Sequence, residues 1–114
     1  MTARQPAEDL SRYADMLSAM GTEPRLRIMR LLLSAHPAGL VVGDIGAELG
    51  IANSTLSHHL ERLRNEGLVG VRREGTFLRY SADAVVLQDL LRFLYSECCT
   101  RSGACEPKKI FTPA

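Results

Sequence analysis

Apolar residues recur at three- and four-residue spacing in the first half of the chain, and this spacing predicts amphipathic helices. Proline at position 24 fits the first turn of the second helix, where its missing N–H is not needed. Gly50 supplies a turn between the third and fourth helices, and Gly67 is expected just after the end of the fourth. The four expected helices cover about 8–20, 23–36, 43–49 and 53–66.

Alternating apolar and polar residues follow these helices. Two such runs, 68–73 and 77–81, flank Glu74-Gly75 and predict a tight β-hairpin. A last helix is expected to begin after Ser81 or Asp83 and to continue to about Glu97. The order of elements is α-α-α-α-β-β-α. Two helices around a short glycine turn, followed by a hairpin, indicate a mainly α (α+β) winged helix-turn-helix fold.

The chain length and the terminal regions set the domain organisation. At 114 residues the chain is expected to form a single winged helix-turn-helix domain over 1–114. A cysteine-containing segment follows at 97–106, and a mobile tail is expected at 107–114. The N-terminus lacks the apolar run of a signal peptide, and no apolar stretch is long enough for a bilayer. We therefore expect a cytoplasmic protein without a membrane partner, whose thiols are reduced.

The predicted fourth helix separates into an apolar and a polar face. Leu56, Leu60 and Leu63 fall on one side and are expected to contact the core, with His59 partly buried at the edge. Short polar side chains near the start of a recognition helix can reach base edges in the major groove. Ser, Thr and Asn also cap ordinary solvated helices, but the preceding helix, the turn and the hairpin favour DNA binding. The candidate DNA-binding residues are Asn53, Ser54, Thr55, Ser57, His58 and Arg62.

The predicted hairpin carries three arginines at or near its tip. Arg72, Arg73 and Arg79 are expected to meet phosphates or the minor groove. The net charge of the whole chain is only +1, so a nucleic-acid signal must come from such local groups. A charged hairpin can also be no more than a soluble sheet edge.

Several stretches of the sequence resemble the ArsR/SmtB family of metalloregulatory repressors: GTEPRLRIMRLLL, GDIGAELGIANSTLSHHLERLRNEGLV and REGTFLRYS. The resemblance covers roughly residues 10–96. It implies a homodimer formed through the first and last helices. It also implies binding to double-stranded operator DNA, with affinity that falls when a metal binds. The apolar residues of the last helix fit this role, because they are too many for one face.

The sequence departs from the two common sensor sites of this family. Val41 and Gly43 stand where many arsenic-sensing relatives carry the cysteines of a Cys-Val-Cys-Asp motif. The last helix has no histidine, which zinc-type relatives use there. Cys98, Cys99 and Cys105 instead resemble a less common ArsR subgroup with a C-terminal three-thiol arsenite site.

All three cysteines of the chain lie within eight residues. Trivalent arsenic and antimony are soft and suit three thiolates, whereas zinc usually takes four ligands. We therefore expect arsenite, or else antimonite, as inducer, with no organic cofactor. Cys98 and Cys99 can face one ion only if the helix ends before them, because consecutive helical residues diverge. Incidental thiols and a thiol–disulfide redox switch remain as alternatives.

Two other functional classes have less support. An enzyme such as an arsenical reductase or thiol oxidoreductase is not expected, because the sequence has no C-x-x-C motif, βαβ pattern or cofactor loop. A winged-helix module that binds only proteins would not need the arginines of the hairpin or the polar face of the fourth helix. The sequence therefore predicts a metalloid-responsive repressor, with a redox-sensing repressor as the alternative.

Overall fold

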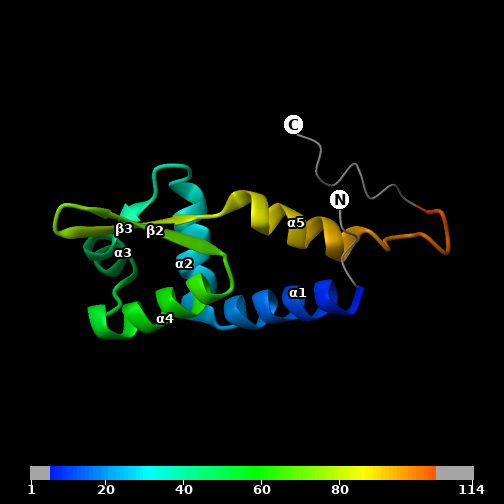
Figure 1. The fold of residues 1–114 in the computed structure, drawn as a ribbon, viewed down its shortest axis with the longest axis horizontal. Coiled ribbons are helices and arrows are strands. Elements are labelled where there is room, and N and C mark those ends of the chain that lie inside the picture. Colours follow the sequence, from blue (N-terminus) through cyan, green and yellow to red (C-terminus); the bar gives the residue numbers. More distant parts are fainter. Residues whose placement is uncertain (1–5, 105–114) are drawn as a thin grey trace. The chain divides into compact units, whose positions relative to one another are not determined.

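A computed structural model describes residues 6–104 of the chain (Figure 1). Its elements are α1 (Pro6–Met20), α2 (Glu23–Ser34), β1 (Leu40–Val41), α3 (Val42–Leu49), α4 (Asn53–Asn65), β2 (Val69–Glu74), β3 (Phe77–Ala82) and α5 (Ala84–Tyr95). The predicted helices and hairpin are all present in this order. The chain divides into one compact unit that ends at Ala84 and another that begins at Val85.

The core of the first unit comes from the apolar faces that the sequence pattern marks. Leu56, Leu60 and Leu63 of α4 are fully buried, as predicted from their spacing. They are joined by apolar side chains from α1, α2, α3, the sheet and the residue before β2: Met16, Ala19, Ile28, Met29, Leu32, Ile45, Leu68, Val69, Tyr80 and Ala82. The burial of one face of α4 leaves its opposite face for solvent and for ligands.

The turn between α3 and α4 follows from the local sequence. Gly50 ends α3 in the left-handed conformation, with φ 67° and ψ 35°, which glycine adopts without the steric cost that a Cβ atom brings. The Ile51 amide then donates to the Gly46 carbonyl at 3.1 Å, and α4 begins at Asn53. Helix α3 contacts α4, β1 and β3, so the helix-turn-helix and the sheet pack together.

The sheet contains a strand that the sequence pattern did not predict. Its order is β1-β3-β2, and both pairings are antiparallel. In β1, Leu40 pairs with Tyr80 and Val41 pairs with Arg79. A strand of two residues is too short to show alternation, which is why the expected order of elements omitted it.

The hairpin turn lies one residue later than predicted. Glu74 pairs with Phe77, so the two loop residues are Gly75 and Thr76 rather than Glu74 and Gly75. Gly75 has φ 63°, and a positive φ at the first loop residue is typical of a type II′ turn. Glu74 therefore belongs to β2, and its side chain is fixed by the ladder.

The last helix is shorter than predicted. Helix α5 ends at Tyr95 rather than near Glu97, and turns follow over 96–102. The loss of apolar periodicity after Tyr95 gives a physical reason for this end. Leu90 is buried, whereas Val85, Leu91, Leu94 and Tyr95 are exposed. Cys105 and the expected tail over 107–114 lie outside the described residues.

Candidate nucleic-acid interface and thiol site

The predicted DNA-reading residues of α4 all lie on its exposed face. The following six residues are all exposed to solvent: Asn53, Ser54, Thr55, Ser57, His58 and Arg62. Ser54, Ser57, His58 and Glu61 line an open hollow of about 310 Å³ along this face. The hollow offers hydroxyl and imidazole groups, which can donate to phosphates and can donate to or accept from base edges.

Arg62 differs from the other exposed residues of α4 because it holds a contact with another helix. Its Nη2 donates to the Oγ of Ser18 in α1 at 3.3 Å. Arg62 thus links α4 to α1, in addition to any contact that it makes with DNA. The sequence pattern did not indicate this link, because Ser18 lies 44 residues away.

His59 is partly buried, as expected from its place at the edge of the apolar face. Burial lowers the pKa of His59, and the positive charge of Arg25 and the neighbouring His58 lower it further. The Arg25 guanidinium is itself held by the backbone carbonyl of Ala19 at the end of α1. The neutral imidazole is therefore the favoured form of His59, and this residue belongs to the packing of α4.

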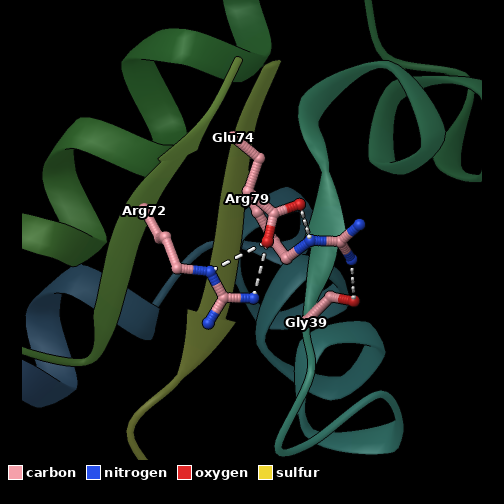
Figure 2. A network of polar contacts seen from close by, with 4 residues as sticks. All are labelled: Gly39, Arg72, Glu74 and Arg79. Atoms are coloured by element: carbon pink, nitrogen blue, oxygen red, sulfur yellow. Dashed lines mark hydrogen bonds and ion pairs between the residues drawn. The ribbon is translucent and has the colours of Figure 1, made fainter. Parts of the chain in front are cut away.

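Two of the three hairpin arginines are bound to one carboxylate (Figure 2). The Glu74 carboxylate lies between the guanidinium groups of Arg72 and Arg79. Arg72 donates to Oε2 through Nε and Nη2, both at 2.9 Å, and Arg79 Nε donates to Oε1 at 2.8 Å. Hydrogen bonds from Arg79 and then from Arg72 hold the pKa of the Glu74 carboxyl below its ordinary value.

Register explains how these side chains meet. Arg72 and Arg79 are cross-strand partners, and Glu74 is two residues from Arg72 in β2, so all three share one face of the hairpin. Arg79 also donates from Nη1 to the Gly39 carbonyl at 3.1 Å, which joins β3 to the residue before β1. Arg73 is exposed and lies on the opposite face, paired with Leu78.

Sequence reasoning missed Glu74 as a functional neighbour of the arginines. A signal was present, because residues i and i+2 of a strand point to the same side, and Glu74 follows Arg72 by two. Using this signal required the correct register of the hairpin, and the sequence pattern placed the turn one residue too early. With Glu74 placed in the turn, its carboxylate had no fixed direction.

Cys98 and Cys99 lie in the turns that follow α5, and both are partly exposed. Their Sγ atoms are 3.4 Å apart. Cys99 has φ 61°, a left-handed conformation that is uncommon outside glycine, and its carbonyl accepts from the Gly103 amide. The end of α5 and this backbone turn remove the divergence that a regular helix would impose on neighbouring side chains.

The spacing of these two sulfurs fits a shared ligand. Two sulfurs each about 2.3 Å from one ion, at angles from about 90° to tetrahedral, are about 3.3–3.8 Å apart. The observed 3.4 Å, in a structure where Cys99 is disulfide-bonded, lies within this range. Within residues 6–104 no three His, Cys, Asp or Glu side chains form a metal-binding group. The third predicted ligand, Cys105, is outside that part of the chain.

The first unit thus combines a helix pair around a tight turn, an exposed polar face on the second of those helices, and a hairpin bearing cations beside it. This is the arrangement of a winged helix-turn-helix DNA-binding domain. The chain belongs to the ArsR family of bacterial regulatory proteins, whose family model matches residues 22–71. This family consists of transcriptional regulators rather than enzymes. None of the helices described in residues 6–104 is long and apolar enough to cross a membrane.

Solved structures and curated relatives agree with this assignment. HlyU from Vibrio cholerae is 31% identical with a TM-score of 0.65, covering 80% of this chain and 96% of that chain; a structure of reduced HlyU is also similar. The homodimeric winged helix-turn-helix domain of Mb0332 from Mycobacterium bovis is 29% identical with a TM-score of 0.65. The match covers 85% of this chain and 92% of that chain. A putative arsenical resistance operon repressor, ArsR2 of Halobacterium salinarum, is 38% identical over 65 residues, covering 57% of this chain and 54% of its own length.

Proposed function

We propose that this protein is a homodimeric, cytoplasmic repressor that leaves its operator when Cys98, Cys99 and Cys105 capture arsenite, or antimonite. The observation that carries the proposal is the 3.4 Å separation of the Cys98 and Cys99 sulfurs just after α5. Once Cys99, which is disulfide-bonded in the structure, is reduced, two thiolates within chelating distance need only one further sulfur to complete a three-coordinate soft site. Cys105 is the remaining cysteine of the chain.

The DNA-binding half of the proposal rests on α4 and the hairpin. Asn53, Ser54, Thr55, Ser57, His58 and Arg62 read the major groove, while Arg72, Arg73 and Arg79 lie in reach of the sugar–phosphate backbone. Family membership and the homodimeric relative from Mycobacterium bovis support a two-fold arrangement, in which two copies of α4 meet successive major grooves. The exposed apolar residues of α5, among them Leu91 and Leu94, supply surface for the second subunit.

Coupling between thiols and DNA would act through α5. Cys98 and Cys99 lie in the turns just after the end of this helix at Tyr95, so closing a site around an ion would restrain the end of the proposed interface. A change in the relative orientation of two subunits alters the spacing of their recognition helices. A coupling free energy of about 1–3 kcal/mol lowers operator affinity about 5- to 150-fold.

The test is a titration of the repressor–promoter complex with arsenite under reducing conditions, read by fluorescence anisotropy. The wild type is compared with Cys98→Ser, Cys99→Ser and Cys105→Ser. Each serine variant should bind the promoter fragment normally and should resist release by arsenite. Ser102→Ala, which changes the same segment and keeps three sulfurs, is the matched control and should respond as the wild type does.

Two results would overturn the arsenite proposal. One is full release of Cys105→Ser by arsenite, because two thiolates would then suffice. The other is X-ray absorption that finds nitrogen ligands around the bound arsenic. Zinc and cadmium should release the complex weakly, because the described residues offer no fourth soft ligand near Cys98.

A second candidate is a repressor that senses thiol oxidation through the same cysteines. The observation that favours it is the disulfide-bonded state of Cys99 in the structure. The similar protein HlyU from Vibrio cholerae has a solved structure in a reduced form, so the redox state also matters for a relative of this chain. Release of DNA by diamide without arsenite, at a level equal to release by arsenite, would favour this candidate over the metalloid sensor.

A further inference from the structure

Glu74 is the only acidic residue of the hairpin 69–82, which carries three arginines. Both of its carboxylate oxygens are engaged, Oε2 by Arg72 and Oε1 by Arg79. Two guanidinium groups that approach one oxyanion from opposite sides reproduce the way arginines surround a phosphate group. In this hairpin the oxyanion belongs to the protein itself (Figure 2).

We infer that Glu74 takes the place of a DNA phosphate on Arg72 and thereby limits the affinity of the repressor for any duplex. The inference rests on the proposed role of the hairpin at DNA. Carboxylate and phosphodiester oxygens compete for the same N–H donors, so an arginine bound to Glu74 is withheld from the nucleic acid. Glu74 is thus an internal competitor built into the DNA-binding surface.

The two arginines differ in how firmly the protein holds them. The Arg79 side chain is 28% exposed and also donates to the Gly39 carbonyl, so it has a structural role without Glu74. The Arg72 side chain is 62% exposed, and its hydrogen bonds are made to Glu74. Removing the carboxylate should therefore release Arg72, whereas Arg79 stays attached to the residue before β1.

The register makes this competition more than a chance surface contact. Arg72 and Arg79 stand directly opposite each other, and like charges at facing positions repel. Glu74 offsets that repulsion from the same face. The ion pair between Glu74 and Arg72 thus stabilises the free protein and at the same time occupies the Arg72 guanidinium. It persists until a DNA phosphate displaces the Glu74 carboxylate.

The test measures binding to the promoter fragment and to a mixed-sequence duplex over a salt series, by fluorescence anisotropy. The proteins are wild type, Glu74→Gln, Arg72→Ala and the double variant. Glu74→Gln should raise affinity for both duplexes by a similar factor, about two- to fivefold, because one exposed ion pair no longer competes. A phosphate contact carries no sequence information, so the ratio of the two affinities should hardly change.

The salt dependence and the double variant give the sharper readout. For Glu74→Gln the slope of log affinity against log salt should steepen by about 0.9, the value for one more neutralised phosphate. The gain should require Arg72, so the double variant should bind both duplexes no more tightly than Arg72→Ala alone. Glu23→Gln is the matched control, because it removes an exposed carboxylate that lies 3.9 Å from Arg27 on α2.

Each alternative outcome has a defined meaning. Weaker binding by Glu74→Gln would show that Glu74 positions the arginines for DNA, and would overturn the inference. A gain equal to that of Glu23→Gln, or one that survives in the double variant, would reduce the effect to net charge and would overturn it too. Failure of the wild type to prefer its promoter fragment would count against the proposed function and not against the role of Glu74.

Discussion

The DNA-reading unit and the cysteine segment differ in what holds their functional side chains. The polar residues of α4 stand on a helix whose other face, Leu56, Leu60 and Leu63, is fully buried. Cys98 and Cys99 stand in turns beyond the end of α5, and their mutual approach depends on the local backbone, including the left-handed conformation of Cys99. The positions of the predicted DNA-reading side chains are thus set by the core, whereas the geometry of the two cysteine sulfurs is set by a short turn.

This difference implies that the two functions respond to different kinds of change. A substitution on the exposed face of α4 should remove a proposed DNA contact and leave the core that positions its neighbours. A substitution in the cysteine segment should alter the proposed ligand chemistry and leave DNA binding in place. Helix α5 should be the exception, because it leads directly into the cysteine segment and supplies the proposed dimer surface.

The largest effect is expected from Leu94→Asp in α5. Leu94 is 59% exposed in the single chain, so an aspartate there should leave the fold intact while placing a charge in the proposed interface. The variant should be a folded monomer by light scattering, and its operator affinity should fall by orders of magnitude because each monomer meets only one half-site. Asp at Leu90, which is 1% exposed, should instead unfold the chain.

Gln88→Asp is the control for Leu94→Asp, because it introduces the same charge at another exposed position of α5. It should remain dimeric and bind the operator as the wild type does. A dimeric Leu94→Asp protein with full operator affinity would refute the proposed interface and break the connection between α5 and both functions.

A smaller and more selective loss is expected from His58→Ala. The imidazole is exposed beside Ser54 and Ser57, and loss of one base contact costs about 1–3 kcal/mol of operator binding. Binding to mixed-sequence DNA and the arsenic stoichiometry should stay unchanged. Arg73→Ala should instead weaken binding to all duplexes and lower the salt slope by about 0.9, as expected for a phosphate contact.

Arg62→Ala tests the same face, but a loss of operator affinity in this variant has two explanations. It removes a proposed DNA contact and also the hydrogen bond from Arg62 to Ser18. Ser18→Ala removes the acceptor and keeps the guanidinium, so it separates the contact with α1 from the contact with DNA. Normal footprints for both His58→Ala and Arg62→Ala would show that this face of α4 does not read the operator.

The smallest effect concerns the pH dependence of stability through His59. Its pKa is lowered in the folded protein, so the unfolded chain binds more protons as pH falls below the ordinary value near 6.5. Stability should therefore decrease slightly as pH falls through that value. Urea unfolding between about pH 7.5 and 5.5 should show a smaller decrease for His59→Gln than for the wild type. An unchanged decrease would exclude His59 as its source, and His36→Gln, at an exposed loop position, is the control.

The fold was predictable from the sequence wherever the burial of one face of a helix or strand imposes a regular spacing of apolar residues. The three leucines of α4, the alternation of the hairpin and the glycine after α3 led to the correct elements and to the exposed face of α4. The two-residue β1 was missed because its pairing with Tyr80 and Arg79 is a long-range contact without a local period. The end of α5 and the hairpin turn were each misplaced by one or two residues, since helix and strand ends depend on individual hydrogen bonds.

The candidate site was less predictable than the fold. Residue type and position identified the polar residues of α4 and the arginines of the hairpin. The bridge from Glu74 to two arginines and the bond from Arg62 to Ser18 depend on register and on helix packing. For the cysteines, the sequence predicts that the last helix continues to about Glu97, and α5 ends at Tyr95. The distance between the two sulfurs could only come from the backbone after that end.

The junction of β1 and α3 has a consequence for engineering. Val41 ends β1 and Gly43 lies in the first turn of α3, with no gap between strand and helix. A Cβ atom added at Gly43 would meet no described atom within 4 Å, so a larger side chain has room there. Cysteines installed at both positions would place one thiol at the end of β1 and one in the first turn of α3, the helix that precedes α4. The fold therefore has room for an engineered pair of thiols at the start of the helix-turn-helix itself, independent of the site proposed at Cys98, Cys99 and Cys105.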